Sequence, residues 1–290
     1  MKSMIITPNP SDPEIQLLTK EFEREGYKVQ YFTPSSAKLS VAFKEKFKDE
    51  FINIEPKAAL VRGFGAAVTQ KIFFRLDILR AIEEYNIKLI NSRESLEIAS
   101  DKFLTSIFLE KHDIPTPKTI ICEDPQTALD SFEELGEDCV LKPLFGSKGI
   151  GITRLNDKGF AENVIYSLGR LNEVFYLQEF IKHRNQDIRI LVLGNKVIAG
   201  MYRVSDSWKT NIYAGARPEP IDINDELEKL AIKAAEATKT EIAGVDILES
   251  EKGYLVLEVN SIPGFTALQR VTDINLAEEI VRYFLEKTKI

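Results

Sequence analysis

The sequence predicts a mixed fold, α/β in its first third and α+β with an antiparallel sheet in the remainder. Up to about residue 97, short apolar runs alternate with helical stretches, which is typical of βαβ units. Beyond that point, apolar runs follow one another across short turns, which favours hairpins and an antiparallel sheet. A chain of 290 residues is long enough for about two domains and more than one hydrophobic core.

Periodicity and turn residues place the elements of the first part in order. Ser11 and Glu14 have the spacing of a capping box, so a helix is expected from there to Gly26, where a glycine can end it. Ser100 is expected to cap a later helix. Residues 38–51 are charged and irregular and receive no assignment. Strands are expected at 3–7, 28–32, 58–61 and 88–90, with further helices at 70–85 and 101–111.

The second part is rich in short apolar runs separated by turn residues, as expected for hairpins. Its helices carry apolar residues at helical spacing and are fewer than its strands. Strands are expected at 118–121, 139–142, 150–155, 174–181, 187–193, 196–204, 242–249 and 254–260, and helices at 125–135, 161–170, 226–239 and 276–287.

Composition excludes several classes of site and partner. Two cysteines, Cys122 and Cys139, exclude a disulfide framework or a cysteine-rich zinc site. Two histidines, His112 and His183, argue against a His-based metal centre and are interpreted as surface or loop residues. A net charge of −7 with scattered basic residues does not give the clustered basic patch that is typical of nucleic-acid-binding proteins. No secretory signal and no apolar run of about 20 residues is present, so we expect a cytoplasmic protein with no membrane partner.

Two carboxylates and an amide are expected to meet on one face of a hairpin. Glu258 and Asn260 are two apart on one strand and therefore share a face, with Leu257 and Val259 on the other. The Asn-Ser-Ile-Pro-Gly turn that follows Glu258 is expected to hold Asn260 in a fixed local geometry.

The register of this hairpin decides whether it can bind a metal ion. A three-residue turn centred on Lys252 would place Asp246 directly opposite Glu258. Two like charges at opposed positions destabilise a sheet, and a cation between them removes the repulsion. Carboxylate and amide oxygens suit Mg²⁺ or Mn²⁺, so Asp246, Glu258 and Asn260 are the candidate metal ligands. The alternative is a solvated polar sheet face.

A glycine-rich segment between two expected strands is the second candidate site. Residues 142–151 read Lys-Pro-Leu-Phe-Gly-Ser-Lys-Gly-Ile-Gly. Successive backbone N–H groups in such a segment can cradle phosphate oxygens, and the two lysines add positive charge. Neither the P-loop nor the dinucleotide fingerprint matches, because the order is G-x-x-G-x-G and a strand follows. Two interpretations stay open, a hairpin lid over phosphates and an ordinary glycine turn.

Several charged residues adjoin apolar strands and helices. Asp187 and Arg189 share one face of a strand, Arg203 ends another, and Lys102 opens a helix. Charges of this kind usually lie on solvated faces. Arg62 follows a strand directly and precedes Gly63, so it either binds an anionic substrate or extends its charged head into solvent.

Taken in order along the chain, these motifs resemble the RimK-type glutamate ligases of the ATP-grasp superfamily. The resemblance runs over nearly the whole chain, and the set in this order is far more specific than each piece. The motifs are Asp101-Lys102, Lys142 before Gly146-Ser147-Lys148-Gly149-Ile150-Gly151, Gln178-Glu179-Phe180-Ile181, Asp187-x-Arg189, Asn211, Gly244-Val245-Asp246-Ile247-Leu248 and Glu258-Val259-Asn260-Ser261-x-Pro263-Gly264.

The resemblance implies a three-part molecule with ATP held between two sheets. The parts are an N-terminal α/β domain (1–97), a central lid domain (98–181) and a C-terminal domain with an antiparallel sheet (182–290). By matched position it implies nucleotide contacts from Lys102, Lys142, Gly146, Ser147, Lys148, Gly149, Gln178, Glu179, Phe180, Ile181, Asp187 and Arg189, two Mg²⁺ or Mn²⁺ ions on Asp246, Glu258 and Asn260, and catalytic roles for Arg203 and Asn211.

The implied activity is that of an ADP-forming carboxylate–amine ligase. A carboxylate attacks the γ-phosphoryl group of ATP, and the amine of an amino acid then displaces phosphate from the acyl phosphate. Phosphoryl transfer needs positioning and charge neutralisation more than covalent help from the protein. This chemistry fits a chain that has only two histidines and two cysteines.

The implied acceptor is less closely specified. Residues 73–80 and the glycine segment look most like the archaeal members that add L-glutamate to tetrahydromethanopterin. Related members act on a deazaflavin coenzyme tail, on the C-terminus of a ribosomal protein or on an amino-group carrier protein, and a non-catalytic ATP-binding sensor is a further alternative. Ala214 departs from relatives that carry a basic residue there, which weakens transfer of the substrate. A homodimer or homotetramer is the family expectation.

Overall fold

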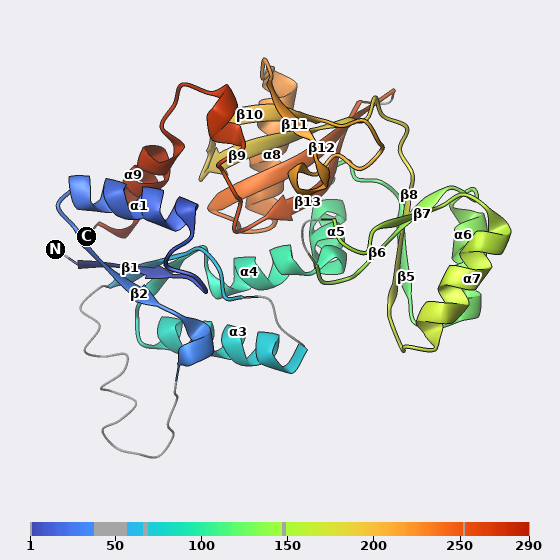
Figure 1. The fold of residues 1–290 in the computed structure, drawn as a ribbon, viewed down its shortest axis with the longest axis horizontal. Coiled ribbons are helices and arrows are strands. Elements are labelled where there is room, and N and C mark those ends of the chain that lie inside the picture. The colour runs from blue at the N-terminus through green and yellow to red at the C-terminus, as the bar shows by residue number, and fades with distance from the viewer. Residues whose placement is uncertain (1, 38–56, 66–68, 147–148, 252, 290) are drawn as a thin grey trace.

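The computed structural model describes residues 2–37, 57–65, 69–146, 149–251 and 253–289, so the unassigned segment 38–51 lies outside the described part. The described chain forms three β-sheets with helices packed against them (Figure 1). The second sheet stands at one side of the molecule, away from both chain ends. Within these ranges, the helices are too short or too polar to cross a membrane.

The first sheet is parallel and covered on both faces. It consists, in spatial order, of β2 (Lys28–Phe32), β1 (Lys2–Ile6), β3 (Ala58–Val61) and β4 (Lys88–Ile90). Met4 and Ile6 pack in the cluster that includes α3 (Thr69–Glu84), whereas Ile5 packs in the cluster that includes α1 (Pro13–Arg24). Burial on both faces explains why these strands read as continuous apolar runs.

The second sheet is small and antiparallel. It consists of β5 (Thr119–Cys122), β8 (Phe175–Glu179), β6 (Cys139–Lys142) and β7 (Thr153–Leu155). Phe175 and Leu177 pack in one cluster with α6 (Pro125–Glu134) and α7 (Lys158–Gly169). Gln178 alternates with them along the strand and lines a cavity instead. One face of this sheet is therefore core and the other is available to a ligand.

The third sheet is antiparallel throughout and is the largest. It consists of β11 (Arg217–Pro220), β10 (Lys196–Val204), β9 (Gln186–Leu193), β12 (Ile242–Ser250) and β13 (Gly253–Asn260). Ile190 and Val245 pack on one face in the cluster that includes α8 (Asp225–Ala237). The opposite face carries Leu193 in a second core and Asp187 in the cavity. The predicted change from a parallel to an antiparallel part is confirmed.

Helices α1 and α9 (Leu276–Thr288) join the first and third sheets in one core. Phe22 of α1 and Phe284 of α9 meet edge to face with ring centroids 5.5 Å apart. The same cluster contains Ile5 of the first sheet and Leu193 of the third. Figure 1 shows both helices beside these sheets, with the chain ends nearby. The domain boundaries at residues 97 and 181 stay a prediction.

Several elements were not predicted, and several helix starts differ from the prediction, most of all that of α7, which begins at Lys158 rather than at residue 161. The missed elements include α4 (Arg93–Ser100), the short edge strand β11 and three short 3-10 helices. Asp101, rather than Ser100, caps α5 (Lys102–Lys111), because its carboxylate accepts from the N–H groups of Phe103 and Leu104. Ser100 is the last residue of α4, which explains why it cannot cap the next helix.

The predicted capping box at Ser11 and Glu14 is wrong. The N-cap of α1 is Asp12, whose side chain accepts from the N–H of Glu14 at 2.9 Å. The Glu14 carboxylate instead binds residues near the other end of the chain, including Phe265 and Thr266. A tertiary contact has replaced the local contact that the spacing predicted.

Asn91 connects the first sheet to the third. Its side-chain oxygen accepts from the N–H of Ile242 at 2.8 Å, and its side-chain nitrogen donates to the carbonyl groups of Ile242 and Ser261. Asn91 is 1% exposed, so water cannot replace its side chain as the hydrogen-bond partner of these backbone groups. Ser95 and Thr240 add a hydroxyl contact of 2.9 Å beside it.

Asn91→Ala is expected to lower the free energy of unfolding by about 2–4 kcal/mol, because three buried backbone groups lose their partner. Urea unfolding followed by circular dichroism measures the change. The control is Asn163→Ala on the exposed side of α7, for which a change within about 0.5 kcal/mol is expected. A loss below about 1 kcal/mol for Asn91→Ala would mean that this contact does not hold the two sheets together.

Candidate active site

A cavity of about 620 Å³ lies between the second and third sheets, with Glu14 of α1 at one end. Its lining runs from Glu14 of α1 to Glu179 of β8, which stand on opposite sides of the molecule (Figure 1). Every predicted site residue that the structure describes lines it. These are Lys102, Lys142, Gly146, Gly149, Gln178, Glu179, Phe180, Ile181, Asp187, Arg189, Arg203, Asn211, Asp246, Glu258 and Asn260. Ser147 and Lys148 lie outside the described residues.

The hairpin of β12 and β13 places Asp246 directly opposite Glu258, as predicted. The route to this register differs from the prediction. Ser250 pairs with Gly253, so the turn holds two residues rather than three, and the predicted turn centre Lys252 lies outside the described part. The register shifts between Asp246 and Ile247, where a β-bulge at Leu257 adds the missing residue.

Because of the bulge, one predicted side-chain orientation is wrong. Leu257 was expected on the face opposite Glu258, but both side chains line the cavity. Val256 and Val259 pack in the core on the other side. A bulge places two residues opposite one partner residue and interrupts the strict alternation of a strand, which explains the error.

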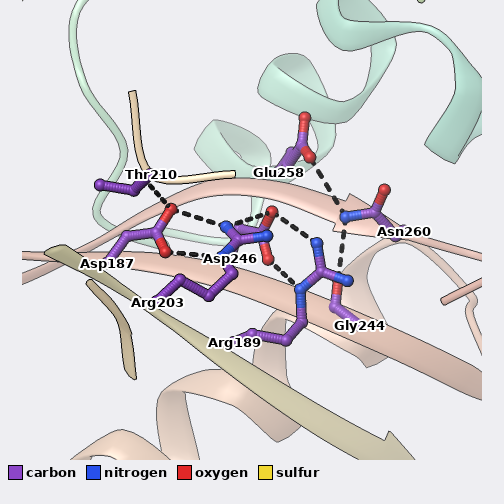
Figure 2. Close-up of polar contacts among 8 residues, drawn as sticks. All are labelled: Asp187, Arg189, Arg203, Thr210, Gly244, Asp246, Glu258 and Asn260. Atoms are coloured by element: carbon purple, nitrogen blue, oxygen red, sulfur yellow. Dashed lines mark hydrogen bonds and ion pairs between the residues drawn. The ribbon is translucent and has the colours of Figure 1, made fainter. Parts of the chain in front are cut away.

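Figure 2 shows a buried network of two arginines and two aspartates on the floor of the cavity. One edge of the Arg203 guanidinium binds Asp187, with Nε and Nη2 donating at 2.7 and 2.6 Å, and its Nη2 also lies 3.0 Å from Asp246. Arg189 also binds both oxygens of Asp246. Thr210 donates its hydroxyl to Asp187 at 2.6 Å. Asp187, Arg203 and Asp246 are at most 6% exposed, so the positive and negative charges must balance inside the protein.

The arginines control the charge of Asp246. Burial would raise the pKa of this carboxyl group, but Arg189 and Arg203 outweigh burial and lower the pKa to about 2. Arg203 also stays positively charged, because the two aspartates raise its pKa against the effect of burial. Asp246 is therefore ionised at neutral pH and can act as a metal ligand without first losing a proton.

Glu258 and Asn260 lie beside this network. The Asn260 side chain donates to Glu258 at 3.2 Å and to the carbonyl of Gly244 at 3.3 Å (Figure 2). Among the described residues, no ion pair engages Glu258, and no group of three His, Cys, Asp or Glu side chains forms a metal cage. The donor set of Asp246, Glu258 and Asn260 fits a hard divalent cation that takes its remaining ligands from water and phosphate.

Two lysines face Glu258 across the cavity. Lys142 donates to the side-chain oxygen of Gln178 at 2.6 Å, and Lys102 donates to the carbonyl of Gly146 at 3.3 Å. Burial lowers the pKa of Lys142 to about 8, with Glu258 opposing and Lys102 reinforcing the effect. Burial also lowers the pKa of Lys102. Two cations that share one unpaired carboxylate have positive charge left for an anionic ligand.

The glycine segment closes the hairpin of β6 and β7 and lies against the third sheet's loop. Gly149 has a φ of +70°, and a side chain there would meet the Asn211 amide nitrogen at 1.8 Å. Gly149 therefore cannot be replaced without moving Asn211. The Asn211 side-chain oxygen is buried without a hydrogen-bond partner in the described part of the chain. Strands β6 and β7 pair antiparallel on either side of this segment, and its action as a lid over phosphates stays a prediction.

The segment Glu179–Ile181 forms the opposite wall. The N–H groups of Glu179 and Phe180 donate to the carbonyls of Lys118 and Asp138. The Phe180 ring is covered by the Arg154 guanidinium, 3.4 Å from the ring centroid, which fixes its position.

Sequence reasoning missed several residues of the cavity wall. His183 was interpreted as a surface or loop residue, but it lines the cavity beside Phe180, and burial lowers its pKa. Glu14 and Thr266 line the end nearest α1. Their position depends on contacts across more than 250 residues of chain, for which the sequence carries no local signal. Arg62 is 8% exposed, so the interpretation that its head extends into solvent is wrong.

Comparisons with known proteins agree with this geometry. Residues 99–284 match the RimK-like ATP-grasp domain. The chain is 38% identical over 301 residues to the tetrahydromethanopterin:alpha-L-glutamate ligase of Methanocaldococcus jannaschii, covering 100% of both chains. It is 36% identical over 213 residues to the alpha-aminoadipate–LysW ligase LysX of Sulfolobus acidocaldarius, covering 71% of this chain and 77% of that protein.

A solved structure shows the same fold. The ATP-grasp ligase PsnB, complexed with a minimal precursor, Mg and ADP, superposes with a TM-score of 0.74 and 21% identity over 99% of both chains. The predicted fold is thereby confirmed. By its matched domain and its full-length relatives, the chain belongs to the RimK-like ATP-grasp family and is an ATP-grasp ligase.

Proposed function

We propose that this chain joins the amine of L-glutamate to a carboxylate of tetrahydromethanopterin, with ATP converted to ADP. The relative that is 38% identical over the full length carries this activity in its name. The observation that carries the proposal is the meeting of an acidic pair, two lysines and a glycine hairpin in one cavity. These are the groups that an ATP–metal complex and its phosphates require.

The residues of the cavity divide the work of phosphoryl transfer between them. Lys102 and Lys142 neutralise phosphate oxygens, and the glycine hairpin covers them and excludes water from the acyl phosphate. Asp246, Glu258 and Asn260 are the residues that would hold Mg²⁺ or Mn²⁺, in a two-ion site, and the bound metal neutralises charge as the phosphoryl group moves. The segment at Phe180 and Ile181 positions the base.

Arg203 and Asn211 are the residues we assign to the second step. Arg203 provides a fixed positive charge between Asp187 and Asp246, where negative charge develops when the amine attacks the acyl phosphate. The unpartnered side-chain oxygen of Asn211 is available to accept a hydrogen bond from a donor such as the attacking amine. Both residues act by position and charge, so no nucleophilic side chain is needed.

The proposal is tested by ADP release from the purified protein with ATP, Mg²⁺ and L-glutamate. Tetrahydromethanopterin, the deazaflavin coenzyme, a glutamate-ending peptide and an amino-group carrier protein serve as acceptors. Release that depends on both L-glutamate and tetrahydromethanopterin supports the proposal. Release with another acceptor would assign a different acceptor substrate and leave the proposed type of reaction unchanged. ATP binding without release for any acceptor, with L-glutamate or other amino acids, overturns the proposed reaction and favours a sensor.

Glu258→Gln is expected to lower the rate of ADP release about 10²–10³-fold, because the amide cannot supply the negative charge that a metal ligand and the lysines require. The circular dichroism spectrum should not change, since Glu258 makes no core contact. Glu249→Gln, exposed on β12, is the matched control and should keep full activity. A Glu258→Gln enzyme with more than half of the parental activity would exclude this residue from the metal site.

Binding of ATP is expected to weaken above about pH 8. Only the protonated Lys142 attracts phosphate, and its pKa of about 8 means that the cation is lost as the pH rises through this value. The Kd for ATP should rise by up to tenfold per pH unit above the pKa of the free protein, and it should level off at the higher pKa that bound phosphate gives Lys142 in the complex. Titration calorimetry from pH 7 to 10 measures it. Lys142→Arg, which stays charged, should flatten the profile, and an equal slope in both proteins would show that another group titrates.

A further inference from the structure

The end of the cavity nearest α1 holds a carboxylate of the protein itself. Glu14 Oε1 accepts from the backbone N–H groups of Phe265 and Thr266, at 2.7 and 2.8 Å, and from the Thr266 hydroxyl at 2.6 Å. Glu14 Oε2 accepts from Arg62 Nη2 at 3.1 Å. Four donors from two distant parts of the chain therefore converge on one carboxylate group.

Arg62 is only partly used by this contact. Its Nη2 group also donates to the carbonyl of Pro263 at 2.8 Å, but its Nε and Nη1 groups have no hydrogen-bond partner in the described part of the chain. The side chain is 3% exposed, so water does not replace the missing acceptors. A buried guanidinium with unused N–H groups favours the entry of a further acceptor, and a second anionic group is the acceptor it binds best.

Glu14 and Thr266 border the cavity, whereas Arg62 and the Phe265 side chain are buried and are not part of its lining. Gly264 and Thr266 are exposed and line it, and the Glu14 side chain is 18% exposed. Glu14 is the second residue of α1 and reaches the donors through a flexible side chain, so it can leave them without unfolding the helix. The segment that carries the donors is held independently, because Asn91 binds the carbonyl of Ser261 and Arg62 that of Pro263.

The position of these donors relates them to the reaction. Phe265 and Thr266 follow Asn260 within six residues, so these donors come shortly after the strand that carries Glu258. The nucleotide segment at Glu179 lies on the other side of the molecule (Figure 1). A ligand at Glu14 would therefore lie at the end of the cavity near α1, away from β8.

We propose that the N–H groups of Phe265 and Thr266, the Thr266 hydroxyl and Arg62 form a carboxylate site for the incoming amino acid, which Glu14 occupies until the substrate displaces it. We call this set the carboxylate nest. The inference rests on the proposed ligase function and extends it, since it names where the amino acid binds. Glu14 is then an internal competitor of the substrate, chemically identical to the group that it is exchanged for.

Internal competition by Glu14 predicts the direction in which the KM for the amino acid changes. If Glu14 fills the carboxylate nest about nine-tenths of the time, the apparent affinity for the amino acid falls about tenfold, because only the open fraction binds it. Weakening the competitor must then strengthen substrate binding. A purely structural role for Glu14 predicts the opposite, since losing the contact would disorder the donors and weaken binding.

The first test is Glu14→Gln, which keeps the size of the side chain but removes its charge. The KM for L-glutamate is expected to fall about tenfold, with the KM for ATP unchanged. Glu23→Gln is the matched control, because it makes the same change of charge at an exposed position of α1. Its KM values should equal those of the parent. An unchanged or higher KM for L-glutamate in Glu14→Gln overturns the inference.

A second pair of variants tests the donors after the competitor has been weakened. In the Glu14→Gln background, Thr266→Val removes the exposed hydroxyl and should raise the KM for L-glutamate at least threefold at constant kcat, and Thr266→Ser should restore it. An unchanged KM for Thr266→Val in this background also overturns the inference. These readouts separate the inference from the proposed function. If the parent shows no glutamate-dependent ADP release, the function fails; if release is normal but neither KM moves, only the carboxylate nest fails.

Discussion

The structure depends above all on the pairing of buried charges across three neighbouring strands. β9 contributes Asp187 and Arg189, β10 contributes Arg203 opposite Asp187, and β12 contributes Asp246 opposite Arg189. A single charge buried at this depth would cost several kcal/mol, and only a complete set avoids that cost. The register of β9 against both neighbours is therefore required by electrostatics as well as by the core. A slip of one residue would move these charges into the apolar face.

The sequence predicted the elements well where a local pattern defines them. The strands at 88–90 and 196–204 have the predicted bounds, because an apolar run ends at a turn on both sides. The opposition of Asp246 and Glu258 was predicted from a three-residue turn and proved right, although a two-residue turn and a bulge produce it. The orientation of Leu257 was wrong because one extra residue in a strand leaves no trace in composition. The short edge strand β11 has two prolines in four residues, which argue against a strand in any sequence-based reading.

The site was predicted where its residues lie in motifs and was missed where they depend on tertiary contacts. Lys142, Glu258 and the glycine hairpin belong to short segments with a recognisable order. Glu14 had a plausible local role in a capping box, and nothing near it in sequence indicates a bond to Thr266. The first sheet thus does more than flank the cavity. Through Asn91, Arg62 and Glu14 it holds the segment that follows the metal-binding strand.

The bulge at Leu257 separates the tip of the hairpin from the carboxylates at its base. Hairpin tips are the places where chains gain and lose residues most readily, and such a change normally shifts every pair along the ladder. Here a two-residue tip with a bulge brings Asp246 opposite Glu258, and a three-residue tip without a bulge would reach the same pairing. The bulge therefore compensates for a difference of one residue in the length of the tip. Chains of this family can change the tip by one residue and still keep the two carboxylates opposite each other.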